Sequence, residues 1–129
     1  MKLSEVSLDV QAIEDGVWRP HPYFDGVMIR VRGSRSDAVE KRRRALLNRL
    51  PQKRRKLGDS VAETEKVEAL CTAECLLEVK GIDDVTYTSE LGVSWAKEPG
   101  MRRFMAGVRE VAEEIGDSEQ QDHEESVSD

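Results

Sequence analysis

Histidine, cysteine and aromatic residues are scarce in this chain of 129 residues. It contains two histidines, two cysteines and 5% aromatic residues. His21 lies in a proline-rich segment and His123 near the end of the chain, so acid–base catalysis by histidine is not expected. Neither Cys71 nor Cys75 has a sequence neighbour that would activate it as a nucleophile. We therefore expect a protein that is not an enzyme and that uses no cofactor.

Metal sites and phosphate sites lack support as well. Cys71 and Cys75 are four residues apart in a helical stretch, where disulfide geometry is poor, and both histidines are distant in sequence. We expect buried, reduced thiols and no metal. The glycines are scattered as turns and helix ends, without a glycine-rich phosphate loop. Adjacent acidic pairs such as Asp83-Asp84 are typical of solvated loops rather than of a catalytic pair.

Long hydrophobic runs are missing too. No apolar segment approaches the roughly 20 residues that cross a bilayer, and residues 1–6 contain no hydrophobic signal segment. The composition is polar, with 38% hydrophobic and 36% charged residues. These features predict a cytoplasmic protein with a modest core and no contact with a membrane.

What the chain does have is a strong separation of charge. Twelve of its twenty Lys and Arg residues lie in the segment 30–56, which we call the basic block. Only Asp37 and Glu40 are acidic there, so the formal charge of the block is 12 − 2 = +10. Because the whole chain carries −6, the remainder sums to −16. Segment 110–129 holds nine acidic residues and no basic one.

Alternating hydrophobicity predicts strands over about residues 3–32. Segment 6–10 alternates apolar and polar residues, which is the period of a half-buried strand. Segment 23–32 is typical of a hairpin with a two-residue turn at Asp25-Gly26. Prolines at positions 20 and 22 predict that the incoming strand is an edge strand or irregular. Three residues after the turn are predicted to face the core: Val27, Ile29 and Val31.

Helical periodicity follows, and it predicts about four helices. The first runs from Asp37 to about Leu50, after several N-cap residues, where Pro51 ends or kinks it, and Gly58 is expected as a stop. The second opens at a capping box formed by Ser60 and Glu63 and ends near Gly81. The apolar stripe predicted for the first helix consists of Val39, Leu46, Leu47 and Leu50.

The last two helices have the clearest boundaries. Thr88 or Ser89 is expected to cap a short helix that contains Trp95. A final amphipathic helix begins at Met101 and ends at Gly116. The prediction is therefore a mostly helical α+β fold: a β-hairpin or small sheet followed by about four helices. Residues 1–116 would form one compact domain and 117–129 a disordered acidic tail.

The basic block has three possible roles. Its charge is sufficient for nucleic acid, but no nucleic-acid-binding signature covers it and the chain is acidic overall. It is also suited to docking an acidic or helical protein, or a second copy of the chain. A third role is a solvated face that keeps the fold soluble. We favour a protein partner. The candidate partner-binding residues are Arg42, Arg43, Arg44, Arg49, Arg54 and Arg55 in the block and the aromatic residues Trp18, Tyr87 and Trp95.

Most aromatic side chains, by contrast, are predicted to pack in the core. The alternative interpretation, a surface on which the bases of single-stranded nucleic acid stack, is less favoured. The expectation of core packing covers Trp18, Tyr23, Phe24, Tyr87, Trp95 and Phe104, of which Trp18 and Trp95 are expected to be partly exposed.

The order of these segments resembles that of the tail assembly chaperones of long-tailed bacteriophages, over most of residues 3–115. The pieces that carry the resemblance are Gly16-Val17-Trp18, the hairpin exit 27–34, the Arg-rich helix, the Ala/Glu-rich stretch 62–78, Gly81-Ile82, Tyr87-Thr88-Ser89-Glu90-Leu91 and the final helix. Two pieces depart mildly from the family pattern. Thr86 stands where a proline is expected before Tyr87-Thr88, and the break before the last helix is Glu98-Pro99 rather than Asp-Pro.

This resemblance implies a small, non-catalytic protein that binds the tape measure protein and keeps it soluble until tail-tube subunits assemble around it. The expected partners are the tape measure protein and, second, the tail tube protein, in the cytoplasm of the host cell. Two alternatives stay open. One is a small nucleic-acid-binding regulator that uses the basic helix 35–56, and the other is a structural head–tail component of the virion.

Overall fold

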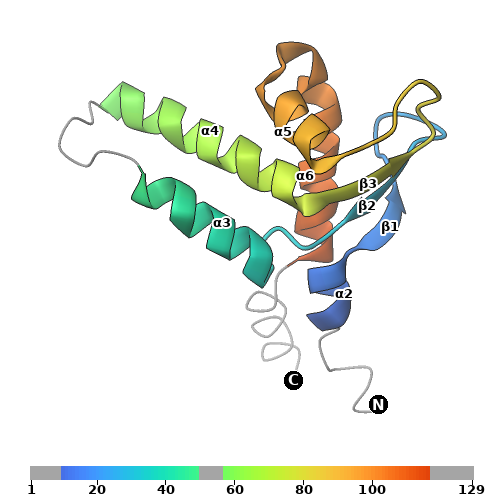
Figure 1. The fold of residues 1–129 in the computed structure, drawn as a ribbon, viewed down its shortest axis with the longest axis horizontal. Helices are drawn as coiled ribbons and strands as arrows, with labels where there is room; N and C mark the ends of the chain where they lie inside the picture. The colour runs from blue at the N-terminus through green and yellow to red at the C-terminus, as the bar shows by residue number, and fades with distance from the viewer. Residues whose placement is uncertain (1–9, 50–56, 117–129) are drawn as a thin grey trace.

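The computed structural model describes residues 10–49 and 57–116, which form a small antiparallel sheet covered by helices (Figure 1). This arrangement confirms the predicted α+β class with mostly helical content. The elements in chain order are α2 (Val10–Asp15), β1 (Val17–Pro20), β2 (Met28–Val31), α3 (Asp37–Asn48), α4 (Leu57–Cys75), β3 (Leu76–Lys80), α5 (Ser89–Lys97), the 3₁₀ helix η2 (Pro99–Met101) and α6 (Arg102–Ile115).

The sheet has the strand order β1-β2-β3, with both neighbouring pairs antiparallel. Ile29 and Val31 of the central strand are fully buried and Val27 is nearly so, which confirms the predicted inward face. The opposite face carries a row of paired residues, Trp18 beside Arg30 and Arg30 beside Glu78. β1 is an edge strand that ends at Pro20, as the prolines predict.

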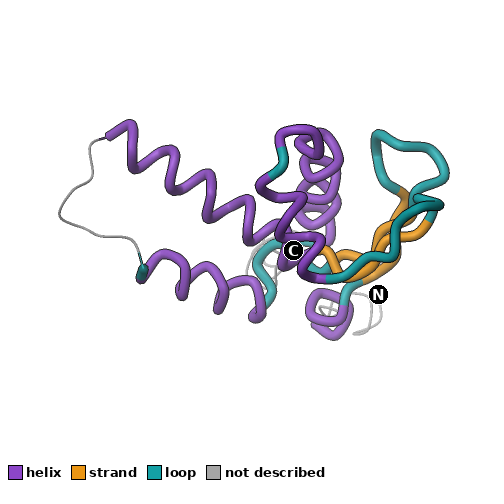
Figure 2. The backbone as a smooth tube through the Cα atoms, turned by 45° about the horizontal axis from the view of Figure 1, so that its top comes forward, coloured by secondary structure: helices purple, strands orange, loops and turns teal. Residues whose placement is uncertain are grey.

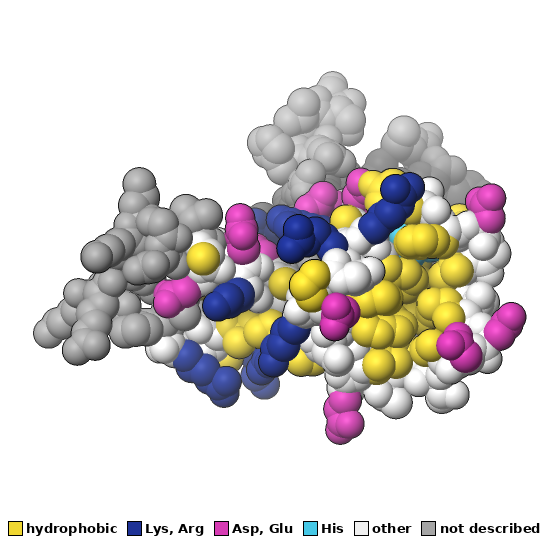
Figure 3. Space-filling model, turned by 90° about the horizontal axis from the view of Figure 1, so that it is seen from above, with side chains coloured by type: hydrophobic (Ala, Val, Ile, Leu, Met, Phe, Trp, Pro, Cys, Tyr) yellow, Lys and Arg dark blue, Asp and Glu magenta, His cyan; other side chains and the backbone are white. Residues whose placement is uncertain are grey.

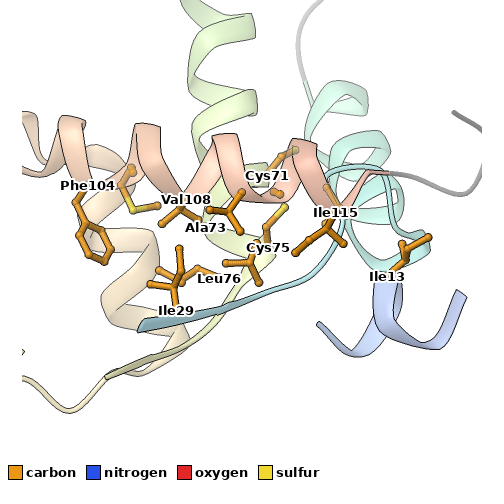
Figure 4. Close-up of a cluster of buried hydrophobic side chains, with 14 of the residues drawn as sticks. Ile13, Ile29, Cys71, Ala73, Cys75, Leu76, Phe104, Val108 and Ile115 are labelled. Carbon is orange, nitrogen blue, oxygen red and sulfur yellow. The ribbon is translucent and has the colours of Figure 1, made fainter. Parts of the chain in front are cut away.

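Helix α6 lies across the inward face of the sheet and supplies much of the core. Phe104 and Val108 lie on the side of α6 that faces Ile29 and Leu76, and Ile115 lies farther along the helix, toward Cys75 and Ile13 (Figure 4). The buried positions of α6 recur at helical spacing, so the predicted amphipathic helix is confirmed. It ends at Gly116, whose φ of +83° is a conformation that favours glycine.

Helices α3 and α4 lie side by side and form an arm that extends away from the sheet (Figures 1 and 2). Val39 and Leu46 of α3 and Val67 and Cys71 of α4 are buried. The C-terminal half of α4 then continues along α5 and α6 (Figure 1). The arm is therefore anchored at one end and reaches into solvent at the other.

The start of α3 is capped from another element. Ser36 occupies the N-cap position, but its hydroxyl makes no capping hydrogen bond. Instead, Glu14 of α2 accepts a hydrogen bond from the backbone N–H of Asp37, at 2.7 Å. A carboxylate at this end also interacts favourably with the helix dipole. This contact ties α2 to the base of the arm.

Two expectations for the N-terminal part need correction. The strand predicted over 6–10 is wrong at its end, because Val10 begins helix α2, while the preceding residues lie outside the described ranges. The strand entering the hairpin is β1, so the connection is a seven-residue loop, 21–27, rather than a two-residue turn. Asp25-Gly26 still forms a turn inside that loop, in which Val27 N–H donates to Phe24 O at 3.3 Å. Gly26 has a φ of +81° there.

The second predicted helix is also wrong at both ends. α4 begins at Leu57, so Gly58 does not stop a helix and Ser60 does not cap one. It ends at Cys75 rather than near Gly81, because residues 76–80 pair with β2 as strand β3. In α3, Leu47 is 40% exposed and does not belong to the buried stripe, and Leu50 and Pro51 lie outside the described residues. The Thr88 cap is confirmed, since its hydroxyl accepts from Leu91 N–H at 3.2 Å.

Candidate functional site

Helices α4, α5 and α6 enclose a groove with a volume of about 490 Å³, which we call the α4–α6 groove. Its apolar floor consists of Ala69 of α4, Trp95 of α5, Pro99 of the turn between α5 and α6, and Met105 and Ala106 of α6. Charged side chains form the rims. The lining residues are Thr64, Glu65, Glu68, Ala69 and Thr72 of α4, Trp95 to Pro99 of α5 and η2, and Arg102, Met105, Ala106 and Arg109 of α6.

One end of the groove is formed by the break between α5 and α6, both of which pack against α4. Glu98 ends α5 and caps η2, since its carboxylate accepts a hydrogen bond from Gly100 N–H at 3.3 Å. Pro99 cannot continue the preceding helix, because it lacks a backbone N–H. The break leaves Trp95 half-buried and Pro99 exposed beside α4. Glu98-Pro99, which stands where the resemblance leads us to expect Asp-Pro, thus forms one end of the groove.

Trp95 also belongs to a chain of aromatic rings that runs toward the sheet. Its ring centroid lies 5.6 Å from Tyr87 and 5.2 Å from Phe104. Phe104 stacks on His21 at 4.6 Å, and His21 contacts Phe24 at 5.1 Å. Figure 3 shows a continuous apolar surface on the sheet side of the molecule, and Lys and Arg side chains over the arm.

The hydrogen bonds of His21 fix it as a structural residue. Its Nδ1 accepts from the backbone N–H of Tyr23 at 3.1 Å, so the proton of the neutral ring is on Nε2. Nε2 then donates to the carbonyl of Phe104 at 2.9 Å. The ring is 4% exposed and both nitrogens are engaged, which leaves no nitrogen to act on a substrate.

Of the predicted arginines, Arg42 and Arg44 lie on α3, and Arg49 is the C-cap residue that follows it. Arg44 and Arg49 are exposed, Arg42 is half-buried, and none of the three forms an ion pair with a residue that the structure describes. Arg54 and Arg55 lie outside the described residues. The exposed part of the basic block therefore includes Arg44 and Arg49, with Arg42 partly exposed beside them.

Arg43 differs from its neighbours, because it packs inside the arm. Its guanidinium pairs with Glu40 of the same helix and, at 3.2 Å, with Glu68 of α4. Burial by itself would lower the pKa of Arg43, but the carboxylates, Glu68 above all, raise the pKa above its ordinary value. Arg43 thus holds α3 against α4 rather than facing a partner.

The structure brings together only part of the predicted aromatic set. Tyr87 and Trp95 are in contact, and both are half-buried. Trp18 lies on the outer face of the sheet, with Lys80 Nζ 4.3 Å from its ring centroid. Trp18 and Tyr87 line a separate cavity of about 400 Å³. None of these rings approaches the arginines of α3, so the predicted residues form two surfaces rather than one.

Tyr23 and Phe24 depart from the general expectation that the aromatic side chains pack in the core. Each is 39% exposed, at the tip of the loop between β1 and β2, instead of facing the core. Tyr23 OH donates to the carboxylate of Glu110, and this hydrogen bond raises the pKa of Tyr23. Most of the groove floor was missed as well. A local signal for it is the spacing of Arg102, Ala106 and Arg109, which puts a small residue between two arginines on one face of the final helix.

Both cysteines are buried, unlinked thiols, as predicted. Burial raises the pKa of Cys71 to about 11 and that of Cys75 to about 12, so both are protonated at neutral pH. A protonated thiol is a poor nucleophile. Within residues 10–49 and 57–116, no three His, Cys, Asp or Glu side chains come together in a way that would hold a metal ion.

None of the helices in the described part of the chain is long and apolar enough to span a membrane. Compared with known protein families, with curated proteins and with solved structures, the chain matches none of them. The features available for a functional assignment are therefore the α4–α6 groove, the exposed arginines of α3 and the apolar surface beside the sheet.

Proposed function

We propose that this chain is a non-enzymatic assembly chaperone that binds an amphipathic helix of a client protein in the α4–α6 groove. The client we propose is the tape measure protein of a long-tailed bacteriophage, in the host cytoplasm, with the tail tube protein as a second partner. The client and the setting rest on the resemblance of the segment order described above.

The observation that supports helix binding most directly is the shape and lining of the groove. Ala69 and Ala106 are small residues that leave room between the walls, while Trp95, Pro99 and Met105 supply apolar area. A groove with an apolar floor and charged rims is suited to an amphipathic helix, whose apolar stripe enters and whose polar side stays in water. Burial of that stripe supplies the affinity.

The exposed arginines of α3 give the proposed chaperone a second property. Arg42, Arg44 and Arg49 lie on the arm, outside the groove. Unpaired surface charges accelerate the encounter with an oppositely charged partner more than they strengthen the final complex. An acidic client would therefore associate faster, and the association rate would fall as salt is added.

The experiment is co-expression of the full chain with the tape measure protein from the same genome, with the soluble fraction of the client as readout. Ala106→Arg fills the groove from an exposed position and should abolish solubilisation. Ala45→Arg is the matched control, because Ala45 is an exposed helical alanine outside the groove, and it should leave solubilisation intact. A client that is equally soluble with and without the chain would overturn the proposal. Adding the tail tube protein tests the second partner in the same assay.

A further inference from the structure

The two walls of the α4–α6 groove carry opposite charges. Glu65 and Glu68 lie on the α4 wall, whereas Lys97, Arg102 and Arg109 lie on the α5–α6 wall. We propose that this groove selects and orients a helix whose apolar stripe has a basic flank on one side and an acidic flank on the other. This inference rests on the proposed helix-binding function and specifies the chemistry of the client segment.

Several of these charges are available to a partner. Glu65, Lys97 and Arg102 make no ion pair with any residue in the described ranges. Glu68 is shared with Arg43, and Arg109 pairs with Glu113 at 3.3 Å, so these two contribute less. The available charges thus stand on both walls, one negative and two positive.

Glu98 is the single acidic residue on the basic wall, and it is already occupied. Its carboxylate accepts the N–H of Gly100 and caps the 3₁₀ turn. It sits at the end of the groove, where α5 stops. The middle of the basic wall is therefore formed by the two arginines of α6.

The spacing of the wall residues fits a helical occupant. On α4 the lining positions run from Thr64 to Thr72, and on α6 from Arg102 to Arg109, each on one face of its helix. At about 1.5 Å per residue, these faces are about 10–12 Å long, or two helical turns. A client helix would hence present two or three turns, with apolar residues at i, i+3, i+4 and i+7 toward the floor.

Opposite walls also determine the direction of the bound helix. Turning a helix end for end, with its apolar stripe still on the floor, exchanges its two flanks. Only one direction then places the acidic flank against Arg102 and the basic flank against Glu65. A nucleic acid strand has no such asymmetry, because its phosphates would meet Glu65 and Glu68 as well as the arginines. The charge pattern thus favours a helix over a polyanion.

The test uses three synthetic peptides with one shared apolar stripe and the full-length protein. One peptide has an acidic and a basic flank, one has two acidic flanks, and one has two basic flanks. Fluorescence anisotropy at low salt should show the mixed-flank peptide binding at least about fivefold tighter than either other peptide, as expected for several surface ion pairs. The preference should vanish in about 1 M salt, where the Debye length is about 3 Å. Equal affinities for all three peptides at low salt would overturn the inference.

Charge reversal in the protein provides the second arm. Arg102→Glu removes one of the two available positive charges from the α5–α6 wall and adds a negative one, so the mixed-flank peptide should lose its advantage over the peptide with two basic flanks. Glu65→Lys should shift the preference to the peptide with two acidic flanks. Both positions are exposed, and circular dichroism checks that the fold is retained. An unchanged ranking of the peptides in both variants would place binding outside the groove and refute the inference.

A nitroxide at the N-terminus of the mixed-flank peptide tests direction. It should broaden amide signals more strongly at one end of the lining face of α4 than at the other, near Thr64 or near Thr72. Equal broadening at the two ends would contradict a fixed direction. Failure of this inference is distinct from failure of the proposed function. If Ala106→Arg abolished client solubilisation but the protein bound all three peptides equally, the proposed chaperone function would stand and the inferred selection by charge would fall.

Discussion

The imidazole ring of His21 occupies the space that a side chain at Gly107 would need. A Cβ placed on Gly107 would lie 2.2 Å from Cε1 and 2.5 Å from Nε2 of His21. The two residues join the loop between β1 and β2 to the middle of α6. Since the His21 ring also binds the Phe104 carbonyl one turn earlier, the loop and helix are held by both packing and a hydrogen bond.

Gly107→Ala should therefore destabilise the protein, although alanine is the better helix former. The gain in helix propensity is about 1 kcal/mol, whereas a methyl group forced into a buried ring displaces both the ring and its hydrogen bonds. We expect a net loss of about 1–3 kcal/mol in the free energy of unfolding, measured by urea denaturation.

Two further variants show whether the clash is the cause. Gly100→Ala is the control, because its Cβ would be 3.6 Å from the nearest atom, the Glu98 carboxylate oxygen. It should be close to wild type. His21→Ala removes the obstructing ring, so Gly107→Ala should cost less in that background. A fully stable Gly107→Ala protein would show that the ring does not define this position.

Tyr87→Phe should cost about 1 kcal/mol of stability. The phenol donates to the Leu76 carbonyl at 3.1 Å, where α4 gives way to β3, and the carbonyl would lose this donor. Burial raises the pKa of Tyr87 to about 12, in keeping with a hydroxyl held away from water. The matched control is Tyr23→Phe, because the hydrogen bond of Tyr23 to Glu110 is exposed to water and should contribute less than the one Tyr87 makes. Equal stability of the two variants by thermal unfolding would contradict a structural role for the Tyr87 hydroxyl.

Sequence predicts α5 and α6 well, because the residues that define them lie within a few positions of one another. Thr88 caps α5 through a residue three positions away, and α6 shows its buried face as a simple repeat. β3 could not be predicted in this way. Residues 76–80 follow a helix without a breaker, and they become a strand only because β2, more than forty residues earlier, supplies its hydrogen bonds.

The candidate site was harder to predict, because it lies between elements. Arg43 looks the same as Arg42 and Arg44 in sequence, and its burial depends on Glu68, 25 residues away. The groove likewise needs α4 and α6 to be placed side by side before Ala69 and Met105 define a floor. Composition alone drew attention to the arginines, and packing separates the one that is structural from those that remain exposed.

The two thiols should make the protein sensitive to alkali. Burial raises the pKa values of Cys71 and Cys75 from an ordinary value of 9.0 to about 11 and about 12. The unfolded state therefore loses these protons first. The stability that comes from holding both thiols protonated in the folded state is fully present below pH 9. It is lost as the pH rises toward the pKa values of the folded protein.

Unfolding curves across pH 7–11 test this effect. The double variant Cys71→Ala, Cys75→Ala should be less stable at neutral pH, because it leaves cavities, yet it should lose less stability between pH 9 and pH 11. In the native wild type at pH 8, both thiols should react with a disulfide reagent only slowly, and in denaturant they should react fast. Parallel stability curves for the two proteins would show that the thiols do not carry the alkaline effect.

Arg43 and Arg44 should separate stability from binding. Arg43→Ala leaves Glu68 without its cation, while Glu40 keeps its ion pair with Arg35, so we expect a loss of about 1–2 kcal/mol after allowing for solvent screening. Arg44→Ala should change stability by less than about 0.5 kcal/mol, because the side chain is exposed and forms no ion pair with a described residue.

The association rate should depend on the arginines that contribute little to stability, and not on Arg43. Replacement of Arg42, Arg44 and Arg49 together should slow association with an acidic client and flatten its salt dependence, while unfolding stays near wild type. If stopped-flow association at low salt were equally fast in that triple variant, the exposed arginines of α3 would be a solvated surface and not a steering face.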